Sequence, residues 1–308
     1  MVSLADFLVR QSRSGSSSKL DKISSLIHWE KYRYRLKKIL SRSGDGPPSY
    51  DEVSMFRILI LQRIYNLSDP QMEEMLYDRL SFRRFCGFGL ADNLPDETTI
   101  CRFRQLLSGK SELLLQLINK DLSAQGICMQ GGKIIDATII DSSGKRPSGG
   151  EQSESDPAAG WTKKRGGYHY GYKSHISTYA ESHLISSTKA TSANVHDGQV
   201  FASLLEGDET IVYADKAYDS KHNRHVLSER QTESGILYKA RRHKPLLHWQ
   251  VQANKLYSKT RHHVERVFAH LKCHYGYRRC RYKGWAANQV HLDLLAIAYN
   301  LKRALTIL

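Results

Sequence analysis

Cysteine is scarce in this chain, and its few cysteines are not paired. The five Cys residues stand at positions 86, 101, 128, 273 and 280, odd in number and without a C-x-x-C pair. This excludes the disulfide framework of small secreted domains and favours free thiols in a reducing compartment. His270, Cys273 and His274 lie close together, but a zinc site needs a second half with matching spacing, so this cluster is weak evidence for zinc.

Long hydrophobic runs are missing as well. The opening MVSLADFLVRQSRSGSSS has a short apolar patch followed by polar residues, unlike the apolar core of a signal peptide. The most apolar segment, LDLLAIAYNLKRALTIL, carries Asp293, Asn300, Lys302 and Arg303 and is too interrupted to span a bilayer. We therefore expect a cytoplasmic protein without a membrane partner.

Acidic residues are in deficit. The 308 residues include 46 Lys and Arg against 31 Asp and Glu, which gives a formal net charge of +15 and a pI near 9.5. Such a balance favours a polyanionic partner such as nucleic acid, although an ordinary basic enzyme has the same composition. With 40% apolar and 25% charged residues, the chain has a globular composition and the length of one large or two smaller domains.

The first part of the chain carries helical patterns. We expect a flexible basic segment over 1–49 that contains an amphipathic helix at 27–40, and a helical DNA-binding or dimerisation domain over 50–128. Ser68 is a predicted helix cap, and so is Asp96. The helix after Asp96 carries Arg102, a side chain suited to DNA contact, although a short helix after a turn is also an ordinary packing element.

From residue 133 onward the pattern changes to strands. Five strands are expected, at 133–140, 168–179, 183–191, 210–215 and 235–240, and the main helices at 196–207, 219–231, 258–277 and 285–305. The Gly-, Ser- and Lys-rich stretch 142–167 predicts a long mobile loop. Three strands before the first helix, followed by alternating strands and helices, predict a mixed α/β sheet over 129–308.

Two predicted strands carry an aspartate where a ligand would bind. Asp136 lies inside the apolar strand KIIDATII, where a charge has poor strand propensity and is costly to bury without a partner. Asp215 closes TIVYAD, where the chain leaves the sheet, and the carboxyl ends of adjacent strands are where α/β sheets bind ligands. Glu265, on the predicted helix 258–277, is the third acid. Three crowded carboxylates need cations among them, and oxygen ligands select Mg²⁺ or Mn²⁺.

Each acid also has an ordinary explanation. Asp215 can cap a helix, and Glu265 can pair with Arg261 on a solvated surface. Asp141 and Asp219 are weaker ligand candidates, because turns and caps favour Asp at such positions. The basic composition and the strand order together favour the metal-binding interpretation.

These motifs resemble those of the DDE transposases of bacterial insertion sequences, specifically the insertion-sequence-five family. The resemblance covers about residues 50–301. Its carriers are SMFRILILQRIYNLSDPQMEEML, LPDETTICRFR, IIDAT, GYKSH, TSANVHD, YADKAY, RHHVERVFAHLK and RYKGW. It implies a ribonuclease H-like catalytic domain, a mixed five-stranded sheet with flanking helices, preceded by a helical N-terminal domain. Asp136, Asp215 and Glu265 would be the catalytic triad that holds two Mg²⁺ ions, for which Mn²⁺ can substitute.

The resemblance also implies DNA contacts. Related transposases carry Y-x2-R-x3-E-x6-K around the Glu, and Arg261, Glu265 and Lys272 match it, whereas Tyr257 stands one residue early. Arg261 and Lys272 would contact phosphates of the transposon end. Asp197 in TSANVHD is a candidate accessory acid near the metals, unless it caps the next helix. The remaining candidates for the DNA strand path are the basic residues Lys163, Lys164, Arg165 and Lys173.

The implied function is a bacterial, nucleoid-associated transposase. It would nick its element at the terminal inverted repeats and join the 3′-OH ends to target DNA, as a homodimer or larger assembly because two ends are held together. Two alternatives stay open: a transposase-derived, sequence-specific DNA-binding protein, and a nuclease of repair or defence. The intact carboxylates argue against the first, and inverted repeats flanking the gene would argue against the second.

Overall fold

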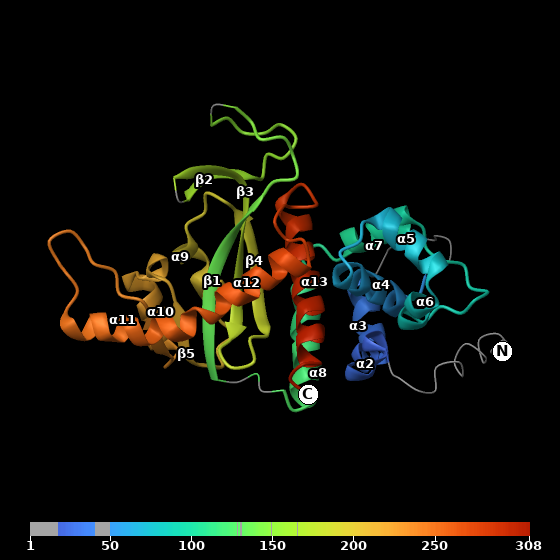
Figure 1. Ribbon diagram of the computed structural model, residues 1–308, viewed down its shortest axis with the longest axis horizontal. Coiled ribbons are helices and arrows are strands. Elements are labelled where there is room, and N and C mark those ends of the chain that lie inside the picture. The colour runs from blue at the N-terminus through green and yellow to red at the C-terminus, as the bar shows by residue number, and fades with distance from the viewer. Residues whose placement is uncertain (1–17, 41–49, 128, 130, 149, 165) are drawn as a thin grey trace.

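The computed structural model describes residues 18–40, 50–127, 129, 131–148, 150–164 and 166–308. An all-helical part comes first in the chain and lies to one side of an α/β part (Figure 1). Its helices are α2 (Lys19–Leu26), α3 (Glu30–Leu40), α4 (Glu52–Ile64), α5 (Asp69–Asp78), α6 (Leu80–Cys86), α7 (Glu97–Leu106) and α8 (Ser111–Ala124).

Several helices begin where the sequence supplies a cap. Ser68 accepts a hydrogen bond from the backbone N–H of Gln71, whose side chain returns to Ser68 and completes the expected capping box of α5. Asp96 caps α7 by accepting from the N–H of Thr99. Both predicted caps are confirmed.

The N-terminal segment contains two helices where we expected one. α3 occupies most of the predicted range 27–40, and α2 precedes it, capped by Ser18. Both helices bury an apolar face, with Ile23 on α2 and Leu36 on α3 among the residues packed into the main core. The described residues 18–40 are therefore a packed part of the helical layer, while the domain boundaries at 49 and 128 remain predictions.

The described part of the α/β region forms a six-stranded mixed sheet rather than the five strands that we expected. The order is β2-β3-β1-β5-β6, and β4 also pairs with β3. β1 is antiparallel to β3 and parallel to β5, and β5 is parallel to β6. The strands are β1 (Gly131–Asp141), β2 (Gly160–Lys164), β3 (Gly167–Tyr179), β4 (Ile185–Ser192), β5 (Glu209–Ala214) and β6 (Glu233–Ile236).

The additional strand is β2, which lies within the stretch predicted as a mobile loop. It pairs with β3 over five residues, and Trp161 stands directly opposite Tyr170. The two rings lie 5.2 Å apart between centroids, and the Trp161 indole donates to the carbonyl of Glu151. An aromatic cross-strand pair of this kind stabilises a short strand. The Gly- and Lys-rich sequence around β2 does not predict this strand.

The helices of the α/β part are α9 (Asp197–Val200), α10 (Lys221–Glu229), α11 (His248–Arg261), α12 (His263–His274) and α13 (Trp285–Ala304), with short 3₁₀ helices η1 (Phe201–Leu204) and η2 (Lys216–Tyr218). The single helix expected over 258–277 is thus divided between α11 and α12. His262 lies at the break and keeps right-handed helical dihedral angles. Within the described residues, no helix has the length and apolar character that crossing a membrane requires.

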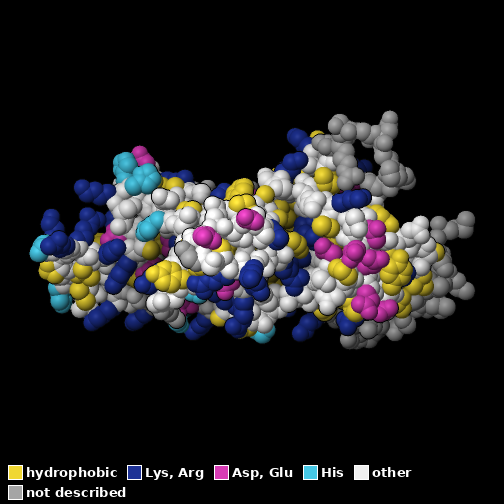
Figure 2. All heavy atoms as spheres, turned by 90° about the horizontal axis from the view of Figure 1, so that it is seen from above, with side chains coloured by type: hydrophobic (Ala, Val, Ile, Leu, Met, Phe, Trp, Pro, Cys, Tyr) yellow, Lys and Arg dark blue, Asp and Glu magenta, His cyan; other side chains and the backbone are white. Residues whose placement is uncertain are grey.

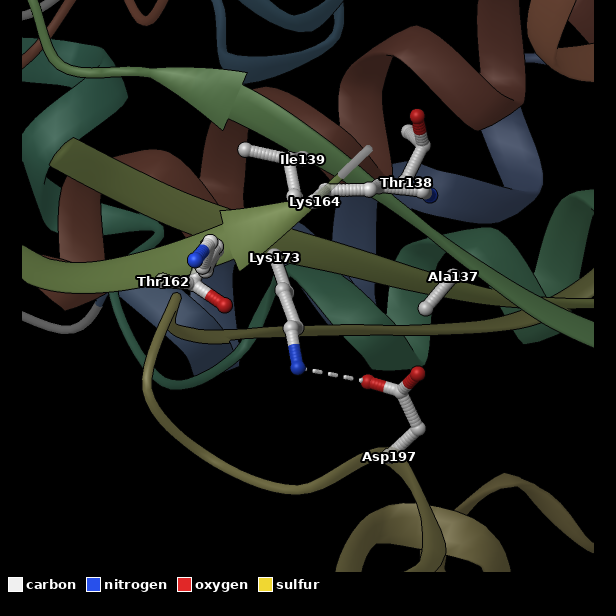
Figure 3. A pocket seen from close by; sticks show the side chains of 8 residues that line it. Ala137, Thr138, Ile139, Thr162, Lys164, Lys173 and Asp197 are labelled. Carbon is white, nitrogen blue, oxygen red and sulfur yellow. Dashed lines mark ion pairs between the residues drawn. The ribbon is translucent and has the colours of Figure 1, made fainter. Parts of the chain in front are cut away.

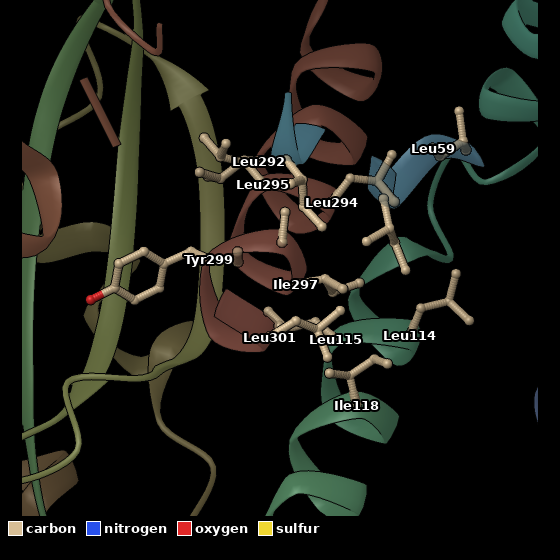
Figure 4. Close-up of a cluster of buried hydrophobic side chains, with 14 of the residues drawn as sticks. Leu59, Leu114, Leu115, Ile118, Leu292, Leu294, Leu295, Ile297, Tyr299 and Leu301 are labelled. Carbon is tan, nitrogen blue, oxygen red and sulfur yellow. The ribbon is translucent and has the colours of Figure 1, made fainter. Parts of the chain in front are cut away.

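α13 joins the helical part to the sheet. It packs against β4 on one side and against α8 and α4 on the other, as Figure 4 shows for the cluster around Leu295 and Ile297. Its buried Asp293 accepts hydrogen bonds from Ser111 on α8, from Thr188 on β4 and from Gln289. These contacts fix the rotation of α13 between the two layers, because a buried carboxylate is tolerated only where its hydrogen bonds are made.

Burial raises the pKa of Asp293 from 3.8 to about 6. When the pKa of an acid is higher in the folded state than in the unfolded state, the folded state holds the proton more tightly. The folded protein is therefore most stable below the unfolded pKa, and it loses this stability as the pH rises through the folded pKa. Asp293→Asn keeps the shape and cannot ionise. We expect its free energy of unfolding, relative to the parent, to rise by about 3 kcal/mol between pH 3 and pH 7, at about 1.4 kcal/mol for each pKa unit.

Urea titrations across this pH range would measure the difference. Asp78→Asn, at an exposed acid of α5, is the matched control for replacing a carboxylate by an amide. A difference for Asp293→Asn that rises with pH no more than that of the control would contradict the assignment of a raised pKa to Asp293.

Candidate active site

The sheet register places two aspartates side by side. β1 and β5 run parallel, with Ile135 of β1 opposite Ala214 of β5. The residue after Ile135 is Asp136, and the residue after Ala214 is Asp215, so the two aspartates are neighbours. Asp215 immediately follows β5 and caps η2, where its carboxylate accepts from the Lys216 N–H at 2.6 Å. The structure therefore brings these two predicted acids together at the carboxyl end of β5, and it also gives Asp215 the capping role that the sequence left open.

Asp136 is a largely buried carboxylate, with 19% of its side chain exposed. Burial raises its pKa to about 6 and the charge of Asp215 adds to the rise, whereas the hydrogen bond from the Ala137 N–H and the charge of Arg261 act against it. The aspartate in the middle of the apolar strand thus lies in a place that resists its charge. A nearby cation is what would offset that cost.

Arg261 is the cation that contacts Asp136. Its guanidinium lies 3.2 Å from the Asp136 carboxylate and 2.6 Å from that of Glu265, so it bridges the two acids. Burial opposes the charge of Arg261, but the hydrogen bond to Glu265 and the charges of the aspartates outweigh burial and raise the pKa of Arg261. His262 also contacts Glu265, at 3.0 Å, and the arginine and histidine together hold the pKa of Glu265 below its usual range against the effect of burial.

The three acids do not form a ready-made metal cluster. Within the described part of the chain, no group of three or more His, Cys, Asp or Glu side chains is placed to hold one metal ion. The donor chemistry nevertheless fits a divalent cation: Asp136 and Asp215 offer neighbouring carboxylate oxygens, and Asp136 lies in a largely buried position that favours added positive charge. In this structure Arg261 supplies that charge.

α12 crosses β1 in the view of Figure 1 and packs against it, and this position explains where Lys272 points. Lys272 donates to the hydroxyl of Thr138 at 2.7 Å, two residues beyond Asp136 on the same face of the strand. Arg261 and Lys272, at the two ends of the predicted stripe, thus both contact β1. Thr138 is a partner that the sequence did not indicate, because a threonine in a strand carries no signal of a contact 134 residues away.

The predicted basic residues of β2 and β3 lie around a small cavity beside β1. A cavity of about 210 Å³ is lined by Lys163, Lys164 and Lys173 together with Thr138 and Asp197. Lys173 and Asp197 point toward each other across it and form an ion pair at 2.9 Å (Figure 3). Asp197 is therefore paired with a lysine, and the cap of α9 is His196 instead.

The other candidates lie elsewhere or in ordinary roles. Arg102 is exposed on α7 in the helical part, and Arg165 lies outside the described residues. Tyr257 packs edge-on against Tyr213 of β5, with the ring centroids 6.0 Å apart. The two weaker acids are both paired: Asp141 with His169 at 3.2 Å, and Asp219 with Arg224 at 2.9 Å.

The bridge through Arg261 gives a prediction about stability without metal. In EDTA, Arg261→Gln leaves Asp136 without its cation, and we expect a loss of about 2 kcal/mol, below the roughly 3–5 kcal/mol typical of a fully buried pair. Asp136→Asn removes the charge that needs compensating. In that background Arg261→Gln should cost less than about 0.5 kcal/mol.

Chemical denaturation of the four proteins of this double-mutant cycle measures the coupling. Equal costs of Arg261→Gln in both backgrounds would mean that the guanidinium does not stabilise the Asp136 carboxylate.

Two protein-family models match the chain. A model described as a transposase domain (DUF772) matches residues 8–106, and a model described as a transposase DDE domain matches residues 129–301. The second match covers more than half of the 308 residues and spans the mixed sheet, α12 and most of α13. The α/β part accordingly has a ribonuclease H-like fold. The chain belongs to the transposases with a DDE domain.

Proposed function

We propose that this transposase nicks the terminal inverted repeats of its element and joins the freed 3′-OH ends to target DNA, with Asp136, Asp215 and Glu265 as its catalytic carboxylates. The observation that carries the proposal is the parallel register that sets Asp136 beside Asp215 at the end of β5. Glu265 approaches from α12 and is linked to Asp136 through Arg261. Carboxyl ends of neighbouring parallel strands are the usual ligand sites of such sheets.

The proposed cofactor is Mg²⁺, two ions per site, with Mn²⁺ as a substitute, because the candidate ligands are all carboxylate oxygens. When bound, the ions would activate the attacking hydroxyl and stabilise the departing 3′ oxygen. The role of Arg261 is to neutralise Asp136 and Glu265 until then. Once released, its planar guanidinium suits a bidentate contact with a phosphate of the transposon end.

The proposed DNA path runs over the face that α12 and β2 share. Burial, and then the nearby charge of Lys164, lower the pKa of Lys272. Lys163 and Lys164 are exposed on β2, and in Figure 2 many basic side chains cover the surface of the α/β part. Arg102 of the helical part and a second copy of the chain would complete the assembly, since two ends have to be held at once.

The decisive experiment uses a plasmid that carries the gene with its genomic flanks. Purified protein is added with Mg²⁺ or with EDTA, and the 3′ ends are mapped by sequencing. We expect metal-dependent cuts at paired inverted repeats. Asp136→Ala and Asp215→Asn should each lower the cleavage rate by at least about three decades, roughly 4 kcal/mol of barrier, while DNA binding persists.

Asp141→Asn is the matched control, because Asp141 lies on the same strand as Asp136 and is paired with His169. It should cut at close to the parent rate. Protection of the repeats without any cut would support a DNA-binding protein instead, and metal-dependent cuts unrelated to the repeats would support a nuclease. Near-normal cutting by Asp136→Ala would remove the triad assignment.

A further inference from the structure

A second basic site lies behind α12. A cavity of about 910 Å³, here called the back cleft, is lined by residues of α2, α12 and α13 and by the turn between β3 and β4. Five Lys and Arg residues line it: Lys19, Lys22, Arg266, Lys302 and Arg303. Four histidines join them: His183, His263, His270 and His274.

The back cleft is on the opposite side of α12 from the proposed catalytic face. At 3.6 residues per turn, the spacing of His263, Arg266, His270 and His274 puts these four side chains on one side of the helix. Glu265 and Lys272 fall on the other side, where they contact Arg261 and Thr138. The two sites therefore share a helix and no side chain.

The positive charge of the back cleft has no acidic counterpart within its lining. None of the described residues that line it is Asp or Glu. Two buried cations elsewhere are paired with acids: Lys133 contacts three, the closest being Glu206 at 2.5 Å, and Arg104 contacts Asp69 at 2.6 Å. Cations gathered without acids leave a positive potential that a bound anion would neutralise.

The histidines experience this potential directly. Burial, and then the charges of His263, Arg303 and Arg266, lower the pKa of His183. Burial, followed by His274, Lys302 and Arg303, lowers the pKa of His270. Both imidazoles thus lie where further positive charge is disfavoured, and a phosphate group beside them would reverse that effect.

His183 is also held in an unusual backbone conformation. It has a φ of +59° in the turn between β3 and β4, a left-handed position that glycine or asparagine occupies at lower cost. Its ring meets that of His263 edge-on at 4.8 Å between centroids. The buried Nδ1 atoms of both rings lack a hydrogen-bond partner within the described part of the chain. Two polar atoms beside a basic cavity thus have hydrogen-bonding capacity that the described side chains leave unused.

We propose that the back cleft binds backbone phosphates of DNA. Cations contributed by α2, α12 and α13 surround it, a spread that suits a chain of phosphates better than a single small anion. A duplex is too wide to enter a cavity of this volume, so one strand would lie across the mouth with its phosphates directed at Arg266 and Lys302. The inference rests on the chain acting on DNA, as its family does, and not on the proposed cleavage chemistry.

The test compares two double variants that each remove two positive charges. Arg266→Gln with Lys302→Gln alters the back cleft, and Lys120→Gln with Lys221→Gln alters exposed lysines of α8 and α10 that do not line it. Affinity for a short duplex of random sequence is measured by fluorescence anisotropy in EDTA between about 50 and 200 mM salt. For the cleft variant we expect weaker binding and a log–log salt slope shallower by about 1.8, at about 0.9 for each lost phosphate contact. The control should keep the parent slope.

A cleft variant with the parent slope, or a control that loses as much, would overturn the inference. A second arm adds inorganic phosphate at constant ionic strength. If phosphate raises the melting temperature of the parent but not of the cleft variant, while their DNA slopes coincide, the cleft is a small-anion site and the proposal fails. His183→Asn, which suits the left-handed backbone, is the second variant should the double variant fold poorly, and its affinity should fall by about fivefold.

These outcomes are separate from those of the cleavage experiment. Since EDTA suppresses metal-dependent cutting, a difference in salt slope can appear in a protein that never cuts DNA. Conversely, cutting at the repeats by a cleft variant with the parent slope would support the proposed chemistry and remove the back cleft from the DNA path.

Discussion

A carboxylate buried inside a sheet has to be matched by a cation, and Asp136 imposes that requirement on the α/β part. Its strand β1 has β3 on one side and β5 on the other, with Asp215 directly after the end of β5. The charge that offsets the pair comes from Arg261 at the end of α11, 125 residues along the chain. This contact, with that between Lys272 and Thr138, holds α12 against β1. Because both groups are largely buried, removing one partner of this contact costs more than breaking a surface ion pair, since it leaves the other charge uncompensated.

The helical part is attached to this arrangement through α13. A single apolar core runs from α2 to α13 and includes Leu36 and Leu295, and the hydrogen bonds of Asp293 connect α8 with β4. Farther along α13, Asn300 donates a hydrogen bond to Asn119 of α8 and forms a second polar contact between the two helices. The helical part and the α/β part are thus separate in sequence, near residue 128, but packed together in space. α13, the last helix of the chain, contacts both of them.

Local patterns of sequence predicted those features that depend on neighbouring residues. The caps at Ser68 and Asp96 and the strand around Asp136 were predictable, since each follows from spacing of a few residues. β2 was not, because its stability comes from the contact of Trp161 with Tyr170 across a hairpin. The bridge from Arg261 to Asp136 was not predictable from spacing either. The resemblance assigned Arg261 to DNA, and only the three-dimensional arrangement shows it against a carboxylate.

The two faces of α12 have a consequence for how the proposed site would work. Metal binding at Asp136 would displace Arg261 and so remove one of the contacts that hold the junction of α11 and α12 to β1. The helix would keep its place, because Val264 and Leu271 are fully buried and Lys272 still reaches Thr138. Phosphates in the back cleft would hold it from the opposite side. Arg261 could then release the Asp136 carboxylate and bind a DNA phosphate while α12, which carries Glu265, stays in place. A fixed helix keeps Glu265 in position for the proposed chemistry.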